Sequence, residues 1–230
     1  MTKRHPHFFR ALSTLNLLNK VGNYWIVLGS LALSYIIKVV SLCENVVFDS
    51  REFGAIAFAG PAKSGKSTIA EETAGLLGWD YFGAGVVFRQ VCAENGVEVS
   101  GAAAADMSVH MGIERRMLEI MREKTRVILD GRTPALIVRE NSLTNVLTVL
   151  VTSSLAVRAD RAVQKSPEKY SNVKRAAKML KSREVEDMEV FGKMYLWSYQ
   201  DPDLYHIVID SSEMTKKETM DNLLDQLTTM

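Results

Sequence analysis

From residue 53 onward, short apolar runs alternate with longer segments in which apolar positions recur at helical spacing. The apolar runs predict buried strands at 55–59, 81–82, 126–130, 147–152 and 207–210. The segments between them predict helices at 65–77, 86–94, 105–124, 155–164, 172–195 and 216–228. Strands that alternate with helices are typical of a parallel sheet covered by helices on both faces. We therefore expect an α/β fold, a three-layer α/β/α sandwich around a five-stranded parallel sheet.

The chain changes in character near residue 50, which predicts an N-terminal extension, 1–50, and an α/β domain, 51–230. The extension has no acidic residue before Glu44, and Lys38 is the only charge within its apolar segment, 24–43. A segment of this length can cross the hydrocarbon core of a membrane as a helix. A buried or partner-docking helix, and an upstream stretch wrongly included in the coding sequence, are the alternatives that hydropathy leaves open.

Composition and net charge exclude some classes of function for this chain. Apolar residues make up 47% of the chain and charged residues 24%, which is typical of a folded globular protein. The formal net charge of +1 argues against the strongly basic surface of proteins that coat nucleic acid, so no nucleic-acid partner is expected. Cys43 and Cys92 form no CxxC motif, which favours free thiols in a reducing compartment.

The segment that follows the first predicted strand matches G-x-x-x-x-G-K-[ST]. Glycines allow such a loop to curl so that its backbone N–H groups point at phosphate oxygens, and the following helix adds its positive end. Lys66 would reach the β- and γ-phosphates, and the Ser67 hydroxyl would bind Mg²⁺. A chance match in a turn is the competing interpretation, but the strand–loop–helix context argues against it. The motif therefore predicts an ATP site made by Gly60, Pro61, Ala62, Lys63, Ser64, Gly65, Lys66, Ser67 and Thr68.

A P-loop alone does not choose among GTPases, motor ATPases and small-molecule kinases, but further motifs follow it. In order along the chain, these are TIAEETAGLLGWDYFGAGVVFRQVC at 68–92, VILDGR at 127–132, LTVLVTSSLAVRADRAV at 147–163 and DPDLYHIVIDSS at 201–212. Over about 55–215 the chain resembles the cytidylate kinases, especially the compact type found in archaea and some bacteria. The resemblance implies a P-loop kinase that uses ATP and Mg²⁺ to phosphorylate a nucleoside monophosphate, above all CMP or dCMP. It also implies an acceptor-binding section near 84–124 and a lid near 164–196.

Two residues at the end of a predicted strand suit phosphoryl transfer. Arg132 leaves the carboxyl end of this strand, where ligands bind in open α/β sheets, and a planar guanidinium suits bidentate contact with an acceptor phosphate. Asp130 is placed to hold a metal-bound water, so Ser67 and Asp130 are the predicted metal residues. The alternatives are a surface salt bridge for Arg132 and a role in the turn for Asp130.

The resemblance implies further roles for aromatic and basic residues. Arg89 would be a second ligand of the acceptor phosphate and Phe88 a wall of the acceptor pocket, although Phe88 can equally be part of the core. Arg161 and Arg183, with Arg158, are candidates for cations that close over the triphosphate, or else they lie on a solvated helix face. The predicted catalytic set is therefore Lys66, Arg132, Arg161 and Arg183.

The predicted lid departs from the family pattern, in which the lid is rich in Lys and Arg. Its sequence, REVEDMEVFGKMY at 183–195, has more acids than bases, and Val86 stands where relatives often carry an acid. Two alternative functions therefore remain: a kinase for AMP, a coenzyme precursor or another small acceptor, and a catalytically weak nucleotide-binding interaction protein. We expect a cytoplasmic monomer whose partners are nucleotide substrates, with membrane association only through 24–43.

Overall fold

The computed structural model describes residues 53–96, 98 and 107–230. The predicted N-terminal extension, with its apolar segment at 24–43, lies outside these residues. In the part of the chain that is described, no helix combines the length and the apolar character needed to cross a membrane.

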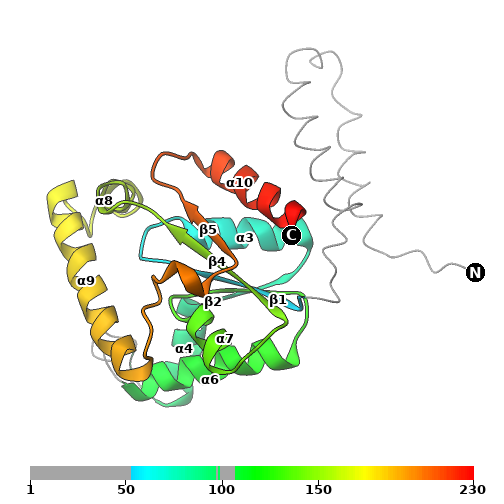
Figure 1. The fold of residues 1–230 in the computed structure, drawn as a ribbon. Coiled ribbons are helices and arrows are strands. Elements are labelled where there is room, and N and C mark those ends of the chain that lie inside the picture. Colours follow the sequence, from blue (N-terminus) through cyan, green and yellow to red (C-terminus); the bar gives the residue numbers. More distant parts are fainter. Residues whose placement is uncertain (1–52, 97, 99–106) are drawn as a thin grey trace, which may run out of the picture. The chain divides into compact units, whose positions relative to one another are not determined.

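Five parallel strands form a single sheet in the described chain (Figure 1). They are β1 (Ala55–Ala59), β2 (Asp80–Gly83), β3 (Val127–Asp130), β4 (Val146–Thr152) and β5 (Ile207–Asp210). Their order across the sheet is β2-β3-β1-β4-β5, so β1 is central and all of its residues are buried. The register sets Phe58 of β1 beside Asp130 of β3, which brings the end of β3 level with the end of β1. The expected five-stranded parallel sheet is confirmed.

Helices fill the intervals between the strands, close to the predicted boundaries. They are α3 (Lys66–Leu77), α4 (Ala84–Glu94), α6 (Met107–Glu123), α7 (Pro134–Glu140), α8 (Leu155–Lys165), α9 (Val173–Met194) and α10 (Lys216–Thr229), with a 3₁₀ turn, η2 (Pro202–Leu204). Helix α9 spans most of the predicted lid and is called the lid helix below.

The helices cover both faces of the sheet, which confirms the three-layer arrangement (Figure 1). Alternate residues of a strand point to opposite faces, and Ala55 and Ala57 of β1 share one core cluster with residues of α4, α6 and α7. Helix α3 packs against β1, β2, β3 and β4, while α10 packs against α3 and β5. Helices α8 and α9 pack against each other beyond the carboxyl ends of the strands (Figure 1).

Helix α7 is the element that the sequence pattern does not predict. Its seven residues, PALIVRE, are too short to show helical periodicity, and five of them are buried. Pro134 lies in the first turn, where its fixed φ angle suits a helix and its missing N–H costs nothing. Tertiary burial on the sheet therefore stabilises a helix that its own sequence only weakly indicates.

Gly60, directly after β1, provides a test of the backbone at this edge of the sheet. Its φ angle is +148°, and a Cβ atom there would lie 2.1 Å from the carbonyl oxygen of Val151. We expect Gly60→Ala to lower the free energy of unfolding by about 1–3 kcal/mol. In urea denaturation, Gly75→Ala is the matched control, because Gly75 lies inside α3 with open space around it and alanine there gains about 0.5–1 kcal/mol. Equal unfolding midpoints for the two variants would contradict the interpretation that the turn after β1 requires glycine at position 60.

Candidate active site

The loop between β1 and α3 has the curled backbone that the P-loop motif predicts. Gly60, Lys63 and Gly65 have φ angles of +148°, +68° and +98°. Such left-handed positions turn successive N–H groups toward one side of the loop, where they can bind an anion. Helix α3 begins directly after Gly65, so the positive end of its dipole faces the same space. Ser64 is completely buried within the loop.

A pocket of about 560 Å³ opens over this loop. Besides the P-loop, it is lined by residues of α8, α10 and the turn after β5. All of the charged residues that line it are basic: Lys63, Lys66, Arg161, Lys165 and Lys216. A pocket with this charge and with N–H groups at its base suits a polyanion such as the phosphate chain of a nucleotide.

The basic residues around Lys63 favour the binding of an anion in this pocket. Partial burial lowers the pKa of Lys63 from its ordinary value, and repulsion from Lys165, Lys169 and Arg183 lowers it further. Glu168 opposes the shift but does not reverse it. Bound phosphate oxygens would relieve this repulsion, so the same cations that destabilise one another provide affinity for a triphosphate.

Lys66, Ser67 and Asp130, which the motif and the strand end predicted separately, lie together in the structure. Nζ of Lys66 lies 3.1 Å from Oδ1 of Asp130 and donates to Oγ of Ser67 over 3.3 Å. The other oxygen of Asp130, Oδ2, accepts a hydrogen bond from the Tyr81 hydroxyl over 2.9 Å. Burial and the adjacent Asp130 raise the pKa of Tyr81 above its ordinary value, which keeps the phenol protonated as a donor. Sequence analysis identified Tyr81 only as part of a short strand.

Within the described residues, no group of three or more His, Cys, Asp or Glu side chains gathers to hold a metal ion. The oxygen donors beside Lys66 are instead one hydroxyl, of Ser67, and one carboxylate, of Asp130. Such a sparse set fits Mg²⁺, which keeps several waters and is commonly bound by one or two protein oxygens together with substrate phosphates.

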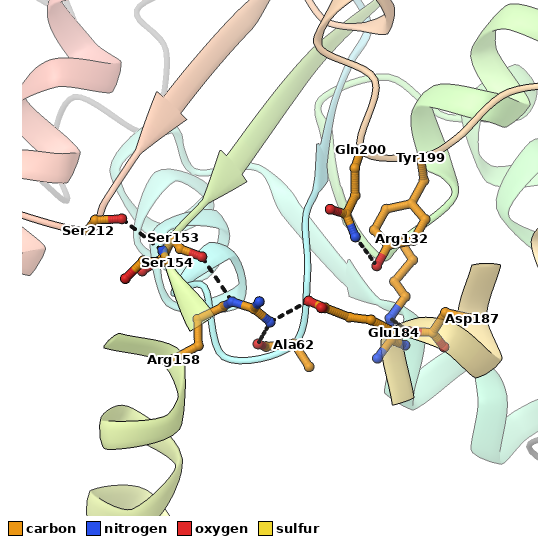
Figure 2. Close-up of polar contacts among 10 residues, drawn as sticks. All are labelled: Ala62, Arg132, Ser153, Ser154, Arg158, Glu184, Asp187, Tyr199, Gln200 and Ser212. Carbon is orange, nitrogen blue, oxygen red and sulfur yellow. Dashed lines mark hydrogen bonds and ion pairs between the residues drawn. The ribbon is translucent and has the colours of Figure 1, made fainter. Parts of the chain in front are cut away.

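The two arginines of α8 hold the backbone of the P-loop. Arg161 donates from Nη1 to the Ser64 carbonyl over 3.0 Å and from Nη2 to the Ser211 carbonyl over 2.8 Å. Arg158 is 5% exposed and donates from Nε to the Ser153 carbonyl over 2.9 Å and from Nη1 to the Ala62 carbonyl over 3.4 Å (Figure 2). Arg161 also lines the pocket, so both its backbone contacts and its charge act at the phosphate site.

Of the two arginines expected to bind the acceptor phosphate, Arg132 is half-buried and forms an ion pair, whereas Arg89 is exposed. Nε of Arg132 lies 2.6 Å from Oδ2 of Asp187 on the lid helix (Figure 2). The pKa of Arg183, on the lid helix, is lowered by partial removal from solvent and then by repulsion from Arg132. Arg89 is exposed, and it forms no ion pair or hydrogen bond with any other described residue. Phe88 is half-buried and packs against the core cluster under α4 and α6.

A half-buried carboxylate that contacts Thr133, the residue after Arg132, was missed by sequence analysis. Glu114 of α6 accepts hydrogen bonds from the hydroxyl groups of Thr133 and Tyr195. Burial raises the pKa of Glu114, while both hydrogen bonds act in the opposite direction. The contacts join α6, the start of α7 and the end of the lid helix. Periodicity gave no signal for them, because Glu114 lies beside the apolar face of α6 rather than in a motif.

The comparisons with known proteins agree with this geometry. The profile of the cytidylate kinase-like family matches residues 55–213. A cytidylate kinase from Aeropyrum pernix is 28% identical over 170 residues, which cover 73% of this chain and 95% of that protein. One from Methanocella arvoryzae is 28% identical over 165 residues, 70% of this chain and 90% of that protein. One from Desulfurococcus amylolyticus is 39% identical over 88 residues, 37% of this chain and 48% of that protein.

Solved structures with low sequence identity share the fold. An uncharacterized protein from Eubacterium ventriosum aligns with a TM-score of 0.60 at 14% identity, over 76% of this chain and 99% of that one. A gluconokinase from Sinorhizobium meliloti aligns with a TM-score of 0.50 at 15% identity, over 76% of this chain and 92% of that one. The family match covers the sheet, the P-loop and the lid helix together. The chain therefore belongs to the cytidylate kinase-like family, a family of phosphotransferases that use ATP.

Proposed function

We propose that the protein transfers the γ-phosphoryl group of ATP to a nucleoside monophosphate in a Mg²⁺-dependent reaction, with CMP or dCMP as the preferred acceptor. The observation that carries the proposal is the P-loop pocket, whose charged lining residues are all basic. The choice of acceptor is supported by relatives that are themselves cytidylate kinases. The proposed enzyme acts as a monomer in the cytoplasm, where ATP is available.

Phosphoryl transfer spreads negative charge over the equatorial oxygens of the moving group, so catalysis consists mainly of positioning and charge neutralisation. In the proposed reaction, the N–H groups of the P-loop and the ammonium group of Lys66 hold the β- and γ-phosphates. Arg132, at the end of β3, would bind the phosphate of the acceptor across the same edge of the sheet. Closure of the lid helix would exclude water, which would otherwise compete as acceptor.

Ser67 and Asp130 are the residues that we propose to hold Mg²⁺, directly or through its waters. A bound Mg²⁺ would neutralise part of the negative charge of the phosphates. Asp130 has one oxygen held by Tyr81 and the other directed at Lys66, so its carboxylate plane is fixed before any ligand binds. Tyr81 would thus act as a positioning residue for the metal site.

A coupled assay of ADP release with CMP, UMP, AMP and GMP tests the proposed reaction. We expect ADP formation to depend on the acceptor and to have the highest kcat/KM with CMP or dCMP. Lys66→Ala is expected to abolish transfer without changing the circular dichroism spectrum, because it removes a phosphate ligand rather than a core contact. A preference for AMP would show that AMP, and not CMP, is the acceptor. ATP binding without acceptor-dependent ADP would support the alternative of a nucleotide-binding interaction protein.

Arg132→Ala tests the acceptor side separately. We expect the variant to raise the KM for CMP and to lower kcat, with a combined loss in kcat/KM of about 100-fold. Arg122→Ala is the control, because Arg122 lies on the exposed end of α6 and bonds only the Asn141 side chain among the described residues. Unchanged kinetics in Arg132→Ala would remove this residue from the site.

Tyr81→Phe tests the positioning of Asp130. Loss of the phenol hydroxyl frees one carboxylate oxygen, so we expect the affinity for ATP in the presence of Mg²⁺ to fall about tenfold. Calorimetry with excess EDTA should then give the same affinity for the variant and the wild type. Tyr205→Phe is the matched control, since the Tyr205 hydroxyl donates to a backbone carbonyl, that of Tyr199, away from the P-loop. An equal loss of affinity with EDTA would assign Tyr81 to the nucleotide instead.

A further inference from the structure

The lid helix presents two carboxylates to arginines of the core (Figure 2). Oδ2 of Asp187 lies 2.6 Å from Nε of Arg132, and Oε1 of Glu184 lies 2.5 Å from Nη1 of Arg158. The two acids are three residues apart, so they lie on the same face of the helix. None of the four side chains is more than 20% exposed, so solvent and salt screen these ion pairs less than they screen surface pairs.

The contact with Asp187 leaves much of the Arg132 guanidinium available. Asp187 engages Nε, and Arg132 forms no hydrogen bond through Nη1 or Nη2 to any described residue. With Asp187 beside Nε, the two terminal nitrogens of the guanidinium can still form the parallel pair of hydrogen bonds that a phosphate accepts. Repulsion from Arg132 also contributes to lowering the pKa of Arg183, so the charge near this carboxylate still favours an anion.

Arg158 is engaged in a different way. Its guanidinium already donates to the carbonyls of Ser153 and Ala62, at the end of β4 and in the P-loop. Glu184 pairs with Nη1 of the same guanidinium, so this ion pair connects the lid helix to the backbone that surrounds the proposed ATP site. Arg158 therefore connects the lid helix to the P-loop, whereas Nη1 and Nη2 of Arg132 remain available to bind a ligand.

We propose that Asp187 is a positioning residue for the acceptor site: it orients Arg132 toward the acceptor phosphate, while Glu184 anchors the same turn of the lid helix to the P-loop through Arg158. The lid helix would thus bring two carboxylates to cations fixed on the core, which gives a role to two of the acids within 183–195. The inference rests on the proposed function, because the acceptor phosphate is the group that Arg132 would hold.

Kinetics of Asp187→Asn test the proposed role. We expect the KM for CMP to rise about tenfold while the KM for ATP changes less than about twofold, since only the acceptor-side cation loses its orientation. Glu189→Gln is the matched control, because it removes an exposed acid from the same helix and should change neither value. In an Arg132→Ala background, Asp187→Asn should add little further loss. Equal increases in both KM values, or no increase in either, would overturn the proposal.

Hydrogen–deuterium exchange tests the contact between Glu184 and Arg158 without any substrate. We expect the backbone amides of the lid helix to exchange faster in Glu184→Gln than in the wild type or in Glu189→Gln. Unchanged exchange would show that Glu184 does not anchor the helix. Should the wild type form no acceptor-dependent ADP, the proposed function would fail, and the exchange data would still decide the role of Glu184 in the lid.

Discussion

The approach of Gly60 to the carbonyl of Val151 is the constraint on which the site depends. It allows the backbone to leave β1 at a sharp angle, and the left-handed angles of Lys63 and Gly65 then return it to the start of α3. The left-handed angle of Lys63 costs conformational energy, which the buried register of β1 between β3 and β4 can offset, whereas Gly65 adopts its angle without a steric penalty. The same register sets Asp130 beside Phe58, so the carboxylate meets Lys66 without any motion of the loop.

Charge is distributed unevenly over the two halves of the site. On the ATP side the charged lining is entirely basic, and Lys63 is repelled by its neighbours. Arg132 and Arg158, in contrast, each form an ion pair with a carboxylate of the lid helix. Coulomb repulsion is thus concentrated where the triphosphate of the proposed donor would bind, and it is reduced around Arg132, where the proposed acceptor would place its single phosphate.

Local patterns were sufficient to predict the sheet and the P-loop, but not the contacts around them. The strands were predicted because their apolar runs are continuous, and the loop because its motif fixes its own backbone. Lys66, Ser67 and Asp130 were identified singly, and the parallel register then brought them together. Tyr81 and Asp187 could not be paired with their partners, because helical or strand spacing gives the face on which a residue lies and not what it meets.

The crowding of like charges around Lys63 links the stability of the fold to its ligand. An empty pocket retains the repulsion among these cationic groups, and a bound polyphosphate would reduce it, so the loaded protein would be the more stable form. Binding of a nucleotide would therefore also raise the free energy of unfolding.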